Sequence, residues 1–285
     1  MKPLHLILII VLSTLTSGIV AHLTIGNNAS SVTQPAQETA YDRIMRTNVI
    51  RCGYSSWKPF LYVNPNTREK AGLFYDLTEE IAKRYNLKVE WTEEVGLGEV
   101  VTALNSHRFD MACSAYWANT NRGKQVYFSN PVFFSKGFVW TRGDDTRQFT
   151  SYEQLNDPAY TFVYIDGGAV AKAIHLRFPK ANKQSLPEMA PISDSYEAVA
   201  TGKADFLEEN KASINDYLQT KPNALKLAVS NPPLILNPVV MMTAGGEDRL
   251  KQMVDNGLRE IELDGTLDRI LTKYKANDLF ERTAY

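Results

Sequence analysis

The sequence predicts an α/β fold in which parallel strands alternate with helices. Three observations lead to this prediction. Short apolar runs are followed by stretches with helical periodicity, this alternation occurs in two successive sets at 49–114 and 160–208, and turn residues separate the segments. Strands and helices that alternate at these lengths form βαβ units, which place the strands in a parallel sheet.

The first set alternates short apolar strands with helices whose apolar residues recur every three or four positions. Val101 and Leu104, for example, face inward on one of these helices. The expected elements are, in order, a strand at 49–54, a turn at 64–67, a helix at 76–85, a strand at 88–92, a helix at 98–107 and a strand at 109–114.

The second set is alike in kind and is followed by two closing helices joined at Gly265. Its first strand is of the buried type and runs into a glycine-containing turn. The expected elements are a strand at 160–165, helices at 169–178 and 196–201, a strand at 204–208, a late strand at 239–243, and helices at 248–264 and 266–274.

The N-terminal segment predicts export. Residues 1–25 carry one lysine before an almost uncharged apolar stretch, which is typical of a secretory signal. A stretch of about 20 apolar residues is also long enough to span a bilayer as an uncleaved anchor. The pattern favours a cleaved signal, and both alternatives place the rest of the chain outside the cytoplasm. Residues 26–40 are rich in small and polar side chains and are expected to form a flexible tether.

Charge and motif content argue against several classes of protein. The 31 basic and 32 acidic residues nearly balance, with no long basic run, which argues against a nucleic-acid partner. Four histidines and two cysteines, none in ligand spacing, argue against a zinc site. The sequence contains no P-loop, Gly-x-Ser-x-Gly or His-Glu-x-x-His motif, so no metal or cofactor is expected.

Arg122 is the strongest candidate for a ligand contact. It follows the buried-looking strand at 109–114. A guanidinium is always charged, and its planar fork matches a carboxylate. At the carboxyl end of a strand in an α/β sheet, such a side chain lies where small ligands usually bind. Arg122 is therefore a candidate carboxylate clamp, and the alternative is a solvated arginine at a helix start.

A series of short motifs resembles a known family. The motifs are Arg51-Cys52-Gly53-Tyr54, Trp57-Lys58-Pro59-Phe60, Gly72 to Leu77, Ala103 to Asp110, Arg122 to Pro131, Ala198 to Asp205, and Glu262 to Leu267 with Ile270 and Lys273-Tyr274. In this order and spacing, they resemble solute-binding protein family 3, the periplasmic receptors of polar amino-acid ABC importers. The resemblance covers essentially the whole chain after residue 41.

The resemblance implies a type II periplasmic binding protein, an α/β fold whose two lobes are joined by two crossing strands and close on a ligand like a hinge. Lobe 1 is expected at 41–134 and 239–285, and lobe 2 at 135–238. The resemblance also implies a monomeric, periplasmic receptor rather than an enzyme. It would capture a small polar carboxylate solute and present it to an ABC permease in the inner membrane.

Five residues of lobe 1 fall at or near ligand positions of the family. Trp57 stands at the position of a ligand-stacking aromatic, since a flat indole can face a cation; the alternative is a core tryptophan. Leu97 falls at a backbone-contact position, with ordinary packing as the alternative. Ser114 ends a strand, where its hydroxyl or main chain could reach a carboxylate. Trp117 replaces the Ser or Thr that the family usually carries five residues before the clamp, Arg122.

Lobe 2 departs from the pattern of amino-acid receptors. Asp166 and Gly168 lie in a strand-end turn where the family usually carries a hydroxyl. The aspartate that holds an α-ammonium falls at Asn210. Glu208 and Glu209 are candidates to replace its charge, although strand alternation lets only one of them face the cleft; the alternative is two solvated glutamates. The ligand is therefore expected to be a carboxylate compound, an amino acid or a related solute.

Two other functions compete with the receptor hypothesis. Dehydratases that act on prephenate-like acids resemble this family, and an enzyme would need a general acid in the cleft, for which Glu208, Glu209 or Asp166 could serve. No Ser/His/Asp or Cys/His arrangement is evident. The third hypothesis is a membrane-anchored sensory module, against which the lack of a kinase, cyclase or glycosidase extension after Tyr285 counts.

Cys52 and Cys113 fall in the first and third strands, which are neighbours in this fold. Neighbouring strands lie about 4.8 Å apart, a separation that a disulfide accepts, and an exported chain is in an oxidising compartment. Adjacent parallel strands give awkward side-chain geometry. We therefore expect the two cysteines to be close, either as a disulfide or as two buried thiols.

Overall fold

The computed structural model describes residues 38–188, 190–229, 232–277 and 280–281. The chain divides into two units between Glu38 and Thr39, and the elements named below belong to the second unit. The expected signal or anchor at 1–25 lies outside the described residues. None of the described helices combines the length and hydrophobicity that a bilayer crossing requires.

Residue 40, which we expected to belong to the flexible tether, is helical, and most of the expected tether lies outside the described residues. Helix α2 (Ala40–Thr47) begins at Ala40, and the hydroxyl of Thr39 accepts a hydrogen bond from the backbone N–H of Asp42, which is N-cap geometry. The buried carboxylate of Glu247 also accepts hydrogen bonds from the N–H groups of Ala40, at 2.7 Å, and Tyr41, at 3.3 Å. These contacts attach the start of the helix to the C-terminal part of the chain.

Lobe 1 is built on three parallel strands, β1 (Val49–Tyr54), β4 (Lys88–Glu94) and β5 (Met111–Trp117). Strand β1 lies between the other two and is parallel to both. The strands and helices predicted for 49–114 are therefore confirmed in kind and order. The other elements of this part are β2 (Tyr62–Val63), β3 (Lys70–Ala71), α3 (Leu73–Arg84), α4 (Val100–Asn105), η1 (Arg122–Lys124) and β6 (Val126–Phe128).

Lobe 2 contains the second α/β set. Strand β8 (Thr161–Ile165) pairs in parallel with β9 (Asn182–Leu186), and helix α5 (Ala169–Arg177) lies between them in the sequence. Strand β10 begins at Leu207, later than the predicted start at residue 204, because Phe206 bridges to Phe162 before the chain pairs with the main sheet. The remaining elements are η2 (Tyr152–Leu155), α6 (Ile192–Ala200), β10 (Leu207–Asn210), α7 (Lys211–Thr220) and β11 (Leu225–Leu227).

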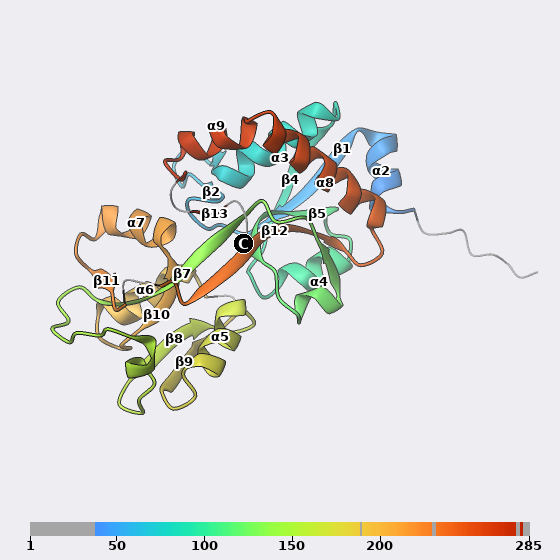
Figure 1. Ribbon diagram of the computed structural model, residues 1–285. Helices are drawn as coiled ribbons and strands as arrows, with labels where there is room; N and C mark the ends of the chain where they lie inside the picture. Colours follow the sequence, from blue (N-terminus) through green and yellow to red (C-terminus); the bar gives the residue numbers. More distant parts are fainter. Residues whose placement is uncertain (1–37, 189, 230–231, 278–279, 282–285) are drawn as a thin grey trace, which may run out of the picture. The chain divides into compact units, whose positions relative to one another are not determined.

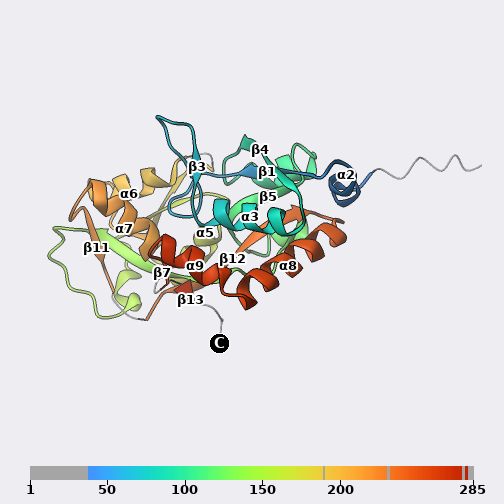
Figure 2. The same ribbon diagram turned by 90° about the horizontal axis from the view of Figure 1, so that it is seen from above.

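Two long antiparallel strands, β7 (Phe133–Arg142) and β12 (Ile235–Ala244), join the lobes. The second half of β12 pairs with β5 and β6 of lobe 1, while its first half pairs with β7. The second half of β7 pairs with β10 and β11 of lobe 2. Figures 1 and 2 show the pair running from one group of elements to the other. These are the two crossing strands of the predicted fold.

The closing helices complete lobe 1, as predicted. Helix α8 (Asp248–Leu263) and helix α9 (Thr266–Lys273) meet at Gly265, whose φ of 75° lies in the left-handed region that favours glycine. Strand β13 (Phe280–Glu281) then pairs with β7. Hydrogen bonds fix this segment on α3: the Tyr85 hydroxyl donates to the carbonyl of Met253, and the Tyr274 hydroxyl accepts from the N–H of Gly72, each at 2.9 Å.

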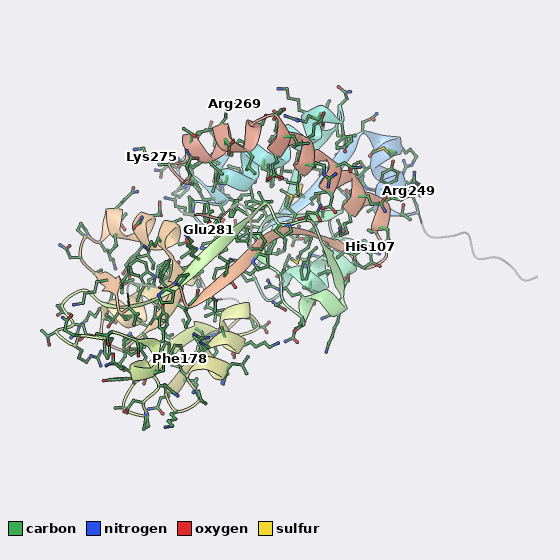
Figure 3. All side chains as sticks on the ribbon, in the orientation of Figure 1. His107, Phe178, Arg249, Arg269, Lys275 and Glu281 are labelled. Atoms are coloured by element: carbon green, nitrogen blue, oxygen red, sulfur yellow. A yellow bond between two sulfur atoms is a disulfide. The ribbon has the colours of Figure 1, made fainter. Side chains whose placement is uncertain are left out.

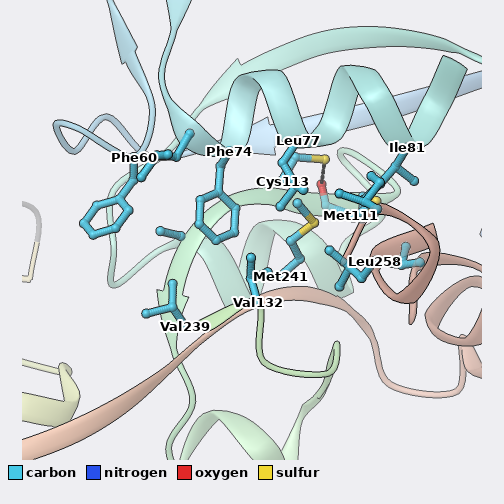
Figure 4. Close-up of a cluster of buried hydrophobic side chains, with 14 of the residues drawn as sticks. Phe60, Phe74, Leu77, Ile81, Met111, Cys113, Val132, Val239, Met241 and Leu258 are labelled. Carbon is cyan, nitrogen blue, oxygen red and sulfur yellow. Dashed lines mark hydrogen bonds between the residues drawn. The ribbon is translucent and has the colours of Figure 1, made fainter. Parts of the chain in front are cut away.

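The apolar cores keep the two lobes distinct. Figure 4 shows side chains of α3 packed with those of β5, β12 and α8 in lobe 1, among them Phe74, Leu77 and Met241. In lobe 2 the rings of Phe162 and Phe178 stack at 4.3 Å, and Figure 3 shows Phe178 within this lobe. Each lobe has a packed interior, and Ala212, Val170 and Ile192 of lobe 2 pack against the lobe 1 cluster where the lobes meet.

The two cysteines form a disulfide. Cys52 of β1 and Cys113 of β5 are bonded, with their Cα atoms 5.5 Å apart, and both are fully buried. Of the two expected alternatives, the structure has the disulfide and not the two free thiols. The bond links the neighbouring strands β1 and β5, and the chain continues from the end of β5 to Arg122.

Candidate functional site

A cavity of about 80 Å³ lies where the two lobes face each other. Since one water needs roughly 10–15 Å³ by this measure, the cavity has room for a small solute. Lobe 1 contributes Trp57, Leu97, Ala115, Tyr116, Trp117 and Arg122. Lobe 2 contributes Val163, Tyr164, Ile165, Asp166, Gly168, Val170, Ile192, Ser195, Glu208 and Glu209.

Arg122 is a buried cation in this wall, with 8% of its surface exposed. The side chain of Asn119 positions it by accepting a hydrogen bond from the backbone N–H of Arg122 at 2.9 Å. The guanidinium donates to the carbonyls of Leu97, at 2.8 Å, and Trp117, at 3.5 Å. Among the described residues it forms no salt bridge. A buried guanidinium that has carbonyls as its protein partners favours an anion in the adjoining cavity.

Burial lowers the pKa of Arg122, while Tyr116 and Glu188 act in the opposite direction. An arginine nevertheless stays charged because its ordinary pKa lies so far above neutrality. Tyr116 lies beneath the guanidinium, with the ring centroid 5.9 Å from Cζ. Its hydroxyl is hydrogen-bonded to Ser55, and burial raises its pKa to about 12. The site therefore carries a permanent positive charge beside a neutral phenol.

Two tryptophans form much of the apolar wall. Trp57 and Trp117 meet edge to face, with ring centroids 5.4 Å apart, and both are more than nine-tenths buried. Neither indole N–H has a hydrogen-bond partner among the described residues. Trp57 is held in its loop by backbone hydrogen bonds with Leu61. The pair offers flat apolar area to whatever enters the cavity.

Glu209 is buried but fully hydrogen-bonded. Its Oε1 accepts from the backbone N–H and the side-chain amide of Asn210, at 2.7 and 2.6 Å, and its Oε2 accepts from the Tyr196 hydroxyl at 2.7 Å. Burial raises the pKa of Glu209 to about 7, although these hydrogen bonds act to lower it. Burial therefore lets Glu209 hold its proton to higher pH than an exposed glutamate.

Glu208 adjoins the same cavity but has no such partners. Neither of its carboxyl oxygens is hydrogen-bonded to a described residue, and burial together with Glu209 raises its pKa well above the usual range. Both glutamates contribute to the cavity wall, but neither carboxyl oxygen of Glu208 is exposed. Strand β10 lies at the end of the main strand order and ends at Asn210, next to the cavity.

Seven of the nine predicted ligand residues line the cavity: Trp57, Leu97, Trp117, Arg122, Asp166, Gly168 and Glu209. Ser114 and Asn210 do not. The Ser114 hydroxyl is fully buried and donates to the carbonyl of Ser55 at 2.9 Å. The Asn210 side chain caps α7 by accepting from the N–H of Ser213 at 2.9 Å, and its amide donates to Glu209. Local hydrogen bonds thus commit both side chains elsewhere.

Several wall residues were not predicted. Five of them directly precede a predicted wall residue at the end of a strand, and this position was the signal that could have identified them. They are Ala115 and Tyr116, before Trp117, and Val163, Tyr164 and Ile165, before Asp166. Ile192 and Ser195 gave none, because α6 starts at Ile192 and not at residue 196 as predicted. Val170 lies in the first turn of α5, immediately after the predicted turn.

The family model for bacterial extracellular solute-binding proteins, family 3, matches residues 50–277. The chain belongs to this family. A probable amino-acid ABC transporter-binding protein of Haemophilus influenzae is 24% identical over 262 residues, which are 90% of this chain and 96% of the relative. The resemblance seen in the sequence motifs is thereby confirmed.

This family 3 protein is also similar to an enzyme and to a solved binding protein. Cyclohexadienyl dehydratase of Pseudomonas aeruginosa is 24% identical over 241 residues, covering 84% of this chain and 87% of the enzyme. The crystal structure of an ancestral amino acid-binding protein, a precursor of cyclohexadienyl dehydratase, matches with a TM-score of 0.72 at 24% identity. The match covers 83% of this chain and 99% of the chain in that crystal structure, and it confirms the two-lobed fold.

Proposed function

We propose that this family 3 protein is the solute-binding receptor of an amino-acid ABC importer and captures a small carboxylate-bearing solute between its lobes. The observation that carries the proposal is Arg122, a buried guanidinium at the cavity whose hydrogen-bond partners are carbonyls. A solute carboxylate can complete its coordination through the planar fork.

Other features of the cavity support the carboxylate. Gly168 is the N-cap of α5 and offers no side-chain cap, so N–H groups of the first turn are available near the wall. A helix N-terminus favours negative charge. The indoles of Trp57 and Trp117 cover the apolar part of a solute and exclude water, which strengthens the electrostatic contacts.

The proposal also includes the partners, the location and the lobe boundaries of the receptor. The receptor acts as a monomer in the periplasm and delivers its solute to an ABC permease in the inner membrane. We place lobe 1 at 41–134 and 239–285 and lobe 2 at 135–238. Both boundaries fall inside the crossing strands β7 and β12, whose pairing changes there from one lobe to the other.

A thermal-shift screen tests the proposal. With the exported chain freed of prior ligand, a few carboxylate solutes should raise the unfolding temperature clearly and most should not. Binding to the folded state alone adds about 2.7 kcal/mol of stability at a hundredfold excess over the dissociation constant. The screen covers amino acids, dicarboxylates and opines. A flat response across all three classes contradicts a receptor role.

Lobe closure gives a second prediction. A Cβ added to Gly98, on a loop of lobe 1, would lie 2.3 Å from Oε2 and 2.4 Å from Cβ of Glu188 in lobe 2. Gly98→Ala is therefore expected to hinder closure and weaken solute binding about 5- to 150-fold, since overpacking costs about 1–3 kcal/mol. Calorimetry with a solute from the screen measures the effect.

The second-site variant Glu188→Gly is the control for this prediction. It removes the three atoms that the new Cβ would approach most closely, so the double variant should recover affinity. An unaltered affinity in Gly98→Ala, or no recovery in the double variant, contradicts the closure contact.

A dehydratase is the second candidate, and Glu208 is the observation that favours it. A buried carboxyl group with a raised pKa keeps its proton to higher pH than an exposed one, which suits a general acid that protonates a leaving hydroxyl group. A receptor and a dehydratase differ in whether they change the compound that they bind. NMR of the protein mixed with prephenate should show the compound unchanged for a receptor, whereas conversion at a rate that Glu208→Gln abolishes supports the enzyme.

A further inference from the structure

The two crossing strands carry buried polar side chains that face each other without pairing. Ser135 of β7 and Asn237 of β12 stand directly opposite in the antiparallel register. Ser135 is fully buried and Asn237 is 7% exposed, yet the Ser135 hydroxyl and the Asn237 amide nitrogen have no hydrogen-bond partner among the described residues. Opposed residues share one face of a strand pair, with Cβ atoms about 4.5–5.5 Å apart. These two polar groups are therefore neighbours that do not meet.

Ser135 and Asn237 lie at the boundary between the two lobes. Alternate residues of a strand point to the same face. On the side of lobe 1, the next pair on this face is Phe133 and Val239, which belong to the lobe 1 core. On the other side, Ile235 packs against a lobe 2 core. The inner face of β7 and β12 therefore passes from one apolar core to the other across a polar pair.

Glu208 adds an unpaired carboxyl group on the lobe 2 side of this pair. Neither of its carboxyl oxygens has a hydrogen-bond partner among the described residues. Its Oε1 lies 1.7 Å from the place that a Cβ on Gly137 would occupy. Gly137 stands opposite Ile235 and two residues after Ser135, so the carboxyl group lies on the same inner face. We call Ser135, Asn237 and Glu208 the polar row, since their unpaired groups follow one another across the lobe boundary.

In this structure the lobes are closed on each other. The Lys172 ammonium group of lobe 2 donates to the Thr120 hydroxyl of lobe 1 at 3.3 Å. The Ser213 hydroxyl of lobe 2 donates to the carbonyl of Lys58, in lobe 1, also at 3.3 Å. A buried polar group that lacks a hydrogen bond raises the free energy of the arrangement that contains it. The polar row therefore disfavours the closed arrangement relative to one in which its members pair.

We propose that the polar row holds the empty receptor open, because its members pair with one another when the lobes rotate apart about the crossing strands. Glu208 moves with lobe 2, whereas Ser135 and Asn237 lie at the boundary, so the rotation changes their separation. A solute must then supply the free energy that unpairs the row, which lowers its apparent affinity. This inference rests on the proposed receptor function. It makes Ser135 and Asn237, neither of which lines the cavity, determinants of affinity.

Ser135→Ala and Asn237→Leu test the inference, since each removes one polar group of the row. Each variant should bind the solutes found by the thermal-shift screen about 5- to 150-fold more tightly than the parent, the range for one unmet buried group. The factor should be the same for every solute, because the row does not touch the solute. Calorimetry measures the affinities. Small-angle X-ray scattering should show a smaller radius of gyration for each unliganded variant than for the unliganded parent.

Thr243→Val is the matched control. Thr243 lies on the same strand, β12, and its hydroxyl is also buried without a hydrogen-bond partner among the described residues. It pairs with Met111 and Tyr127, which both belong to lobe 1, so its surroundings stay the same when the lobes rotate. Removing this hydroxyl should raise stability in a urea titration and leave both the affinity and the radius of gyration unchanged.

The other outcomes separate this inference from the receptor function. If Ser135→Ala and Asn237→Leu fold but leave affinity and radius unchanged, or lower the affinity, the row does not hold the lobes open, while the receptor function stands. An unliganded parent that is already as compact as its solute-bound form overturns the inference in the same way. If the thermal-shift screen is flat, the receptor function fails. Scattering then decides the inference alone, and equal radii for parent and variants overturn it.

Discussion

Replacing Arg122 with lysine is expected to weaken binding of carboxylate solutes by about 2–5 kcal/mol, or roughly 30- to several-thousandfold in dissociation constant. An ammonium group is a point charge that cannot reproduce the planar fork. In addition, the guanidinium bridges the carbonyls of Leu97 and Trp117, and lysine cannot hold both in the same geometry. Calorimetry with solutes from the thermal-shift screen measures the loss.

Arg249→Lys is the matched control. Arg249 lies on α8, its side chain is 66% exposed and pairs with Asp42, and Figure 3 shows it at the surface. This exchange should leave affinity unchanged, because an exposed ion pair contributes little. If Arg122→Lys binds as tightly as the parent, Arg122 is not the carboxylate seat. Loss of folding, detected by circular dichroism, would instead indicate a structural role.

Removing the disulfide is expected to lower the free energy of unfolding by about 4 kcal/mol. Cys52 and Cys113 are 61 residues apart, and a bond that closes a loop of this length removes that much chain entropy from the unfolded state in the entropy model. Urea titration of the oxidised protein and of the Cys52→Ala/Cys113→Ala variant measures the difference. Alanine is the suitable replacement because both positions are fully buried.

Two further measurements make this prediction decisive. Dithiothreitol should destabilise the parent protein and leave the double-alanine variant unaffected. Thiol titration of the denatured, unreduced parent should find no reactive thiol. Two reactive thiols would contradict the bond itself, and equal denaturation midpoints would show that the bond contributes no stability.

The fold could be predicted from the sequence where its signals are local. Helix α3 has an apolar face with helical spacing and Lys83 and Arg84 in its last turn, and such periodicity needs no knowledge of the partner. Strand β5 was predicted to end at Ser114 but continues to Trp117, because Tyr116 and Trp117 pair with Val240 and Val239 of β12. More than 100 residues separate these partners, so no local pattern shows the pairing.

The crossing strands illustrate the same limit. Strand β7 contains Ser135, Lys136 and Gly137, which interrupt any apolar alternation, yet it is a continuous strand because β12, β10 and β11 pair with it along its length. Tertiary pairing here overrides the weak strand propensity of these residues. The residues themselves predicted only the part of β12 at 239–243, and the crossing of two strands between the lobes followed from the family resemblance.

At the cavity, the sequence predicted which residues line the wall better than it predicted where their side chains point. The order of motifs brought Arg122 and Trp57 to the wall where a ligand contact was expected. Asn210 instead turns to Ser213, three residues on, in an N-cap that is visible in the sequence but that competes with the ligand role. The position of Glu208 depends on Gly137 in a distant strand, so it could not be inferred from β10 alone.

The closing helices also bear on the order in which the chain can be completed during synthesis. Lobe 1 begins with α2, β1 and α3, but the apolar face of α3 packs on α8 and α9, which follow lobe 2 in the sequence. Lobe 2 is continuous between these parts, so its core can form from residues already synthesised. The lobe that is started first is therefore finished last. Until α8 and α9 are available, the apolar face of α3 stays uncovered, which exposes this part of the chain to misfolding and aggregation.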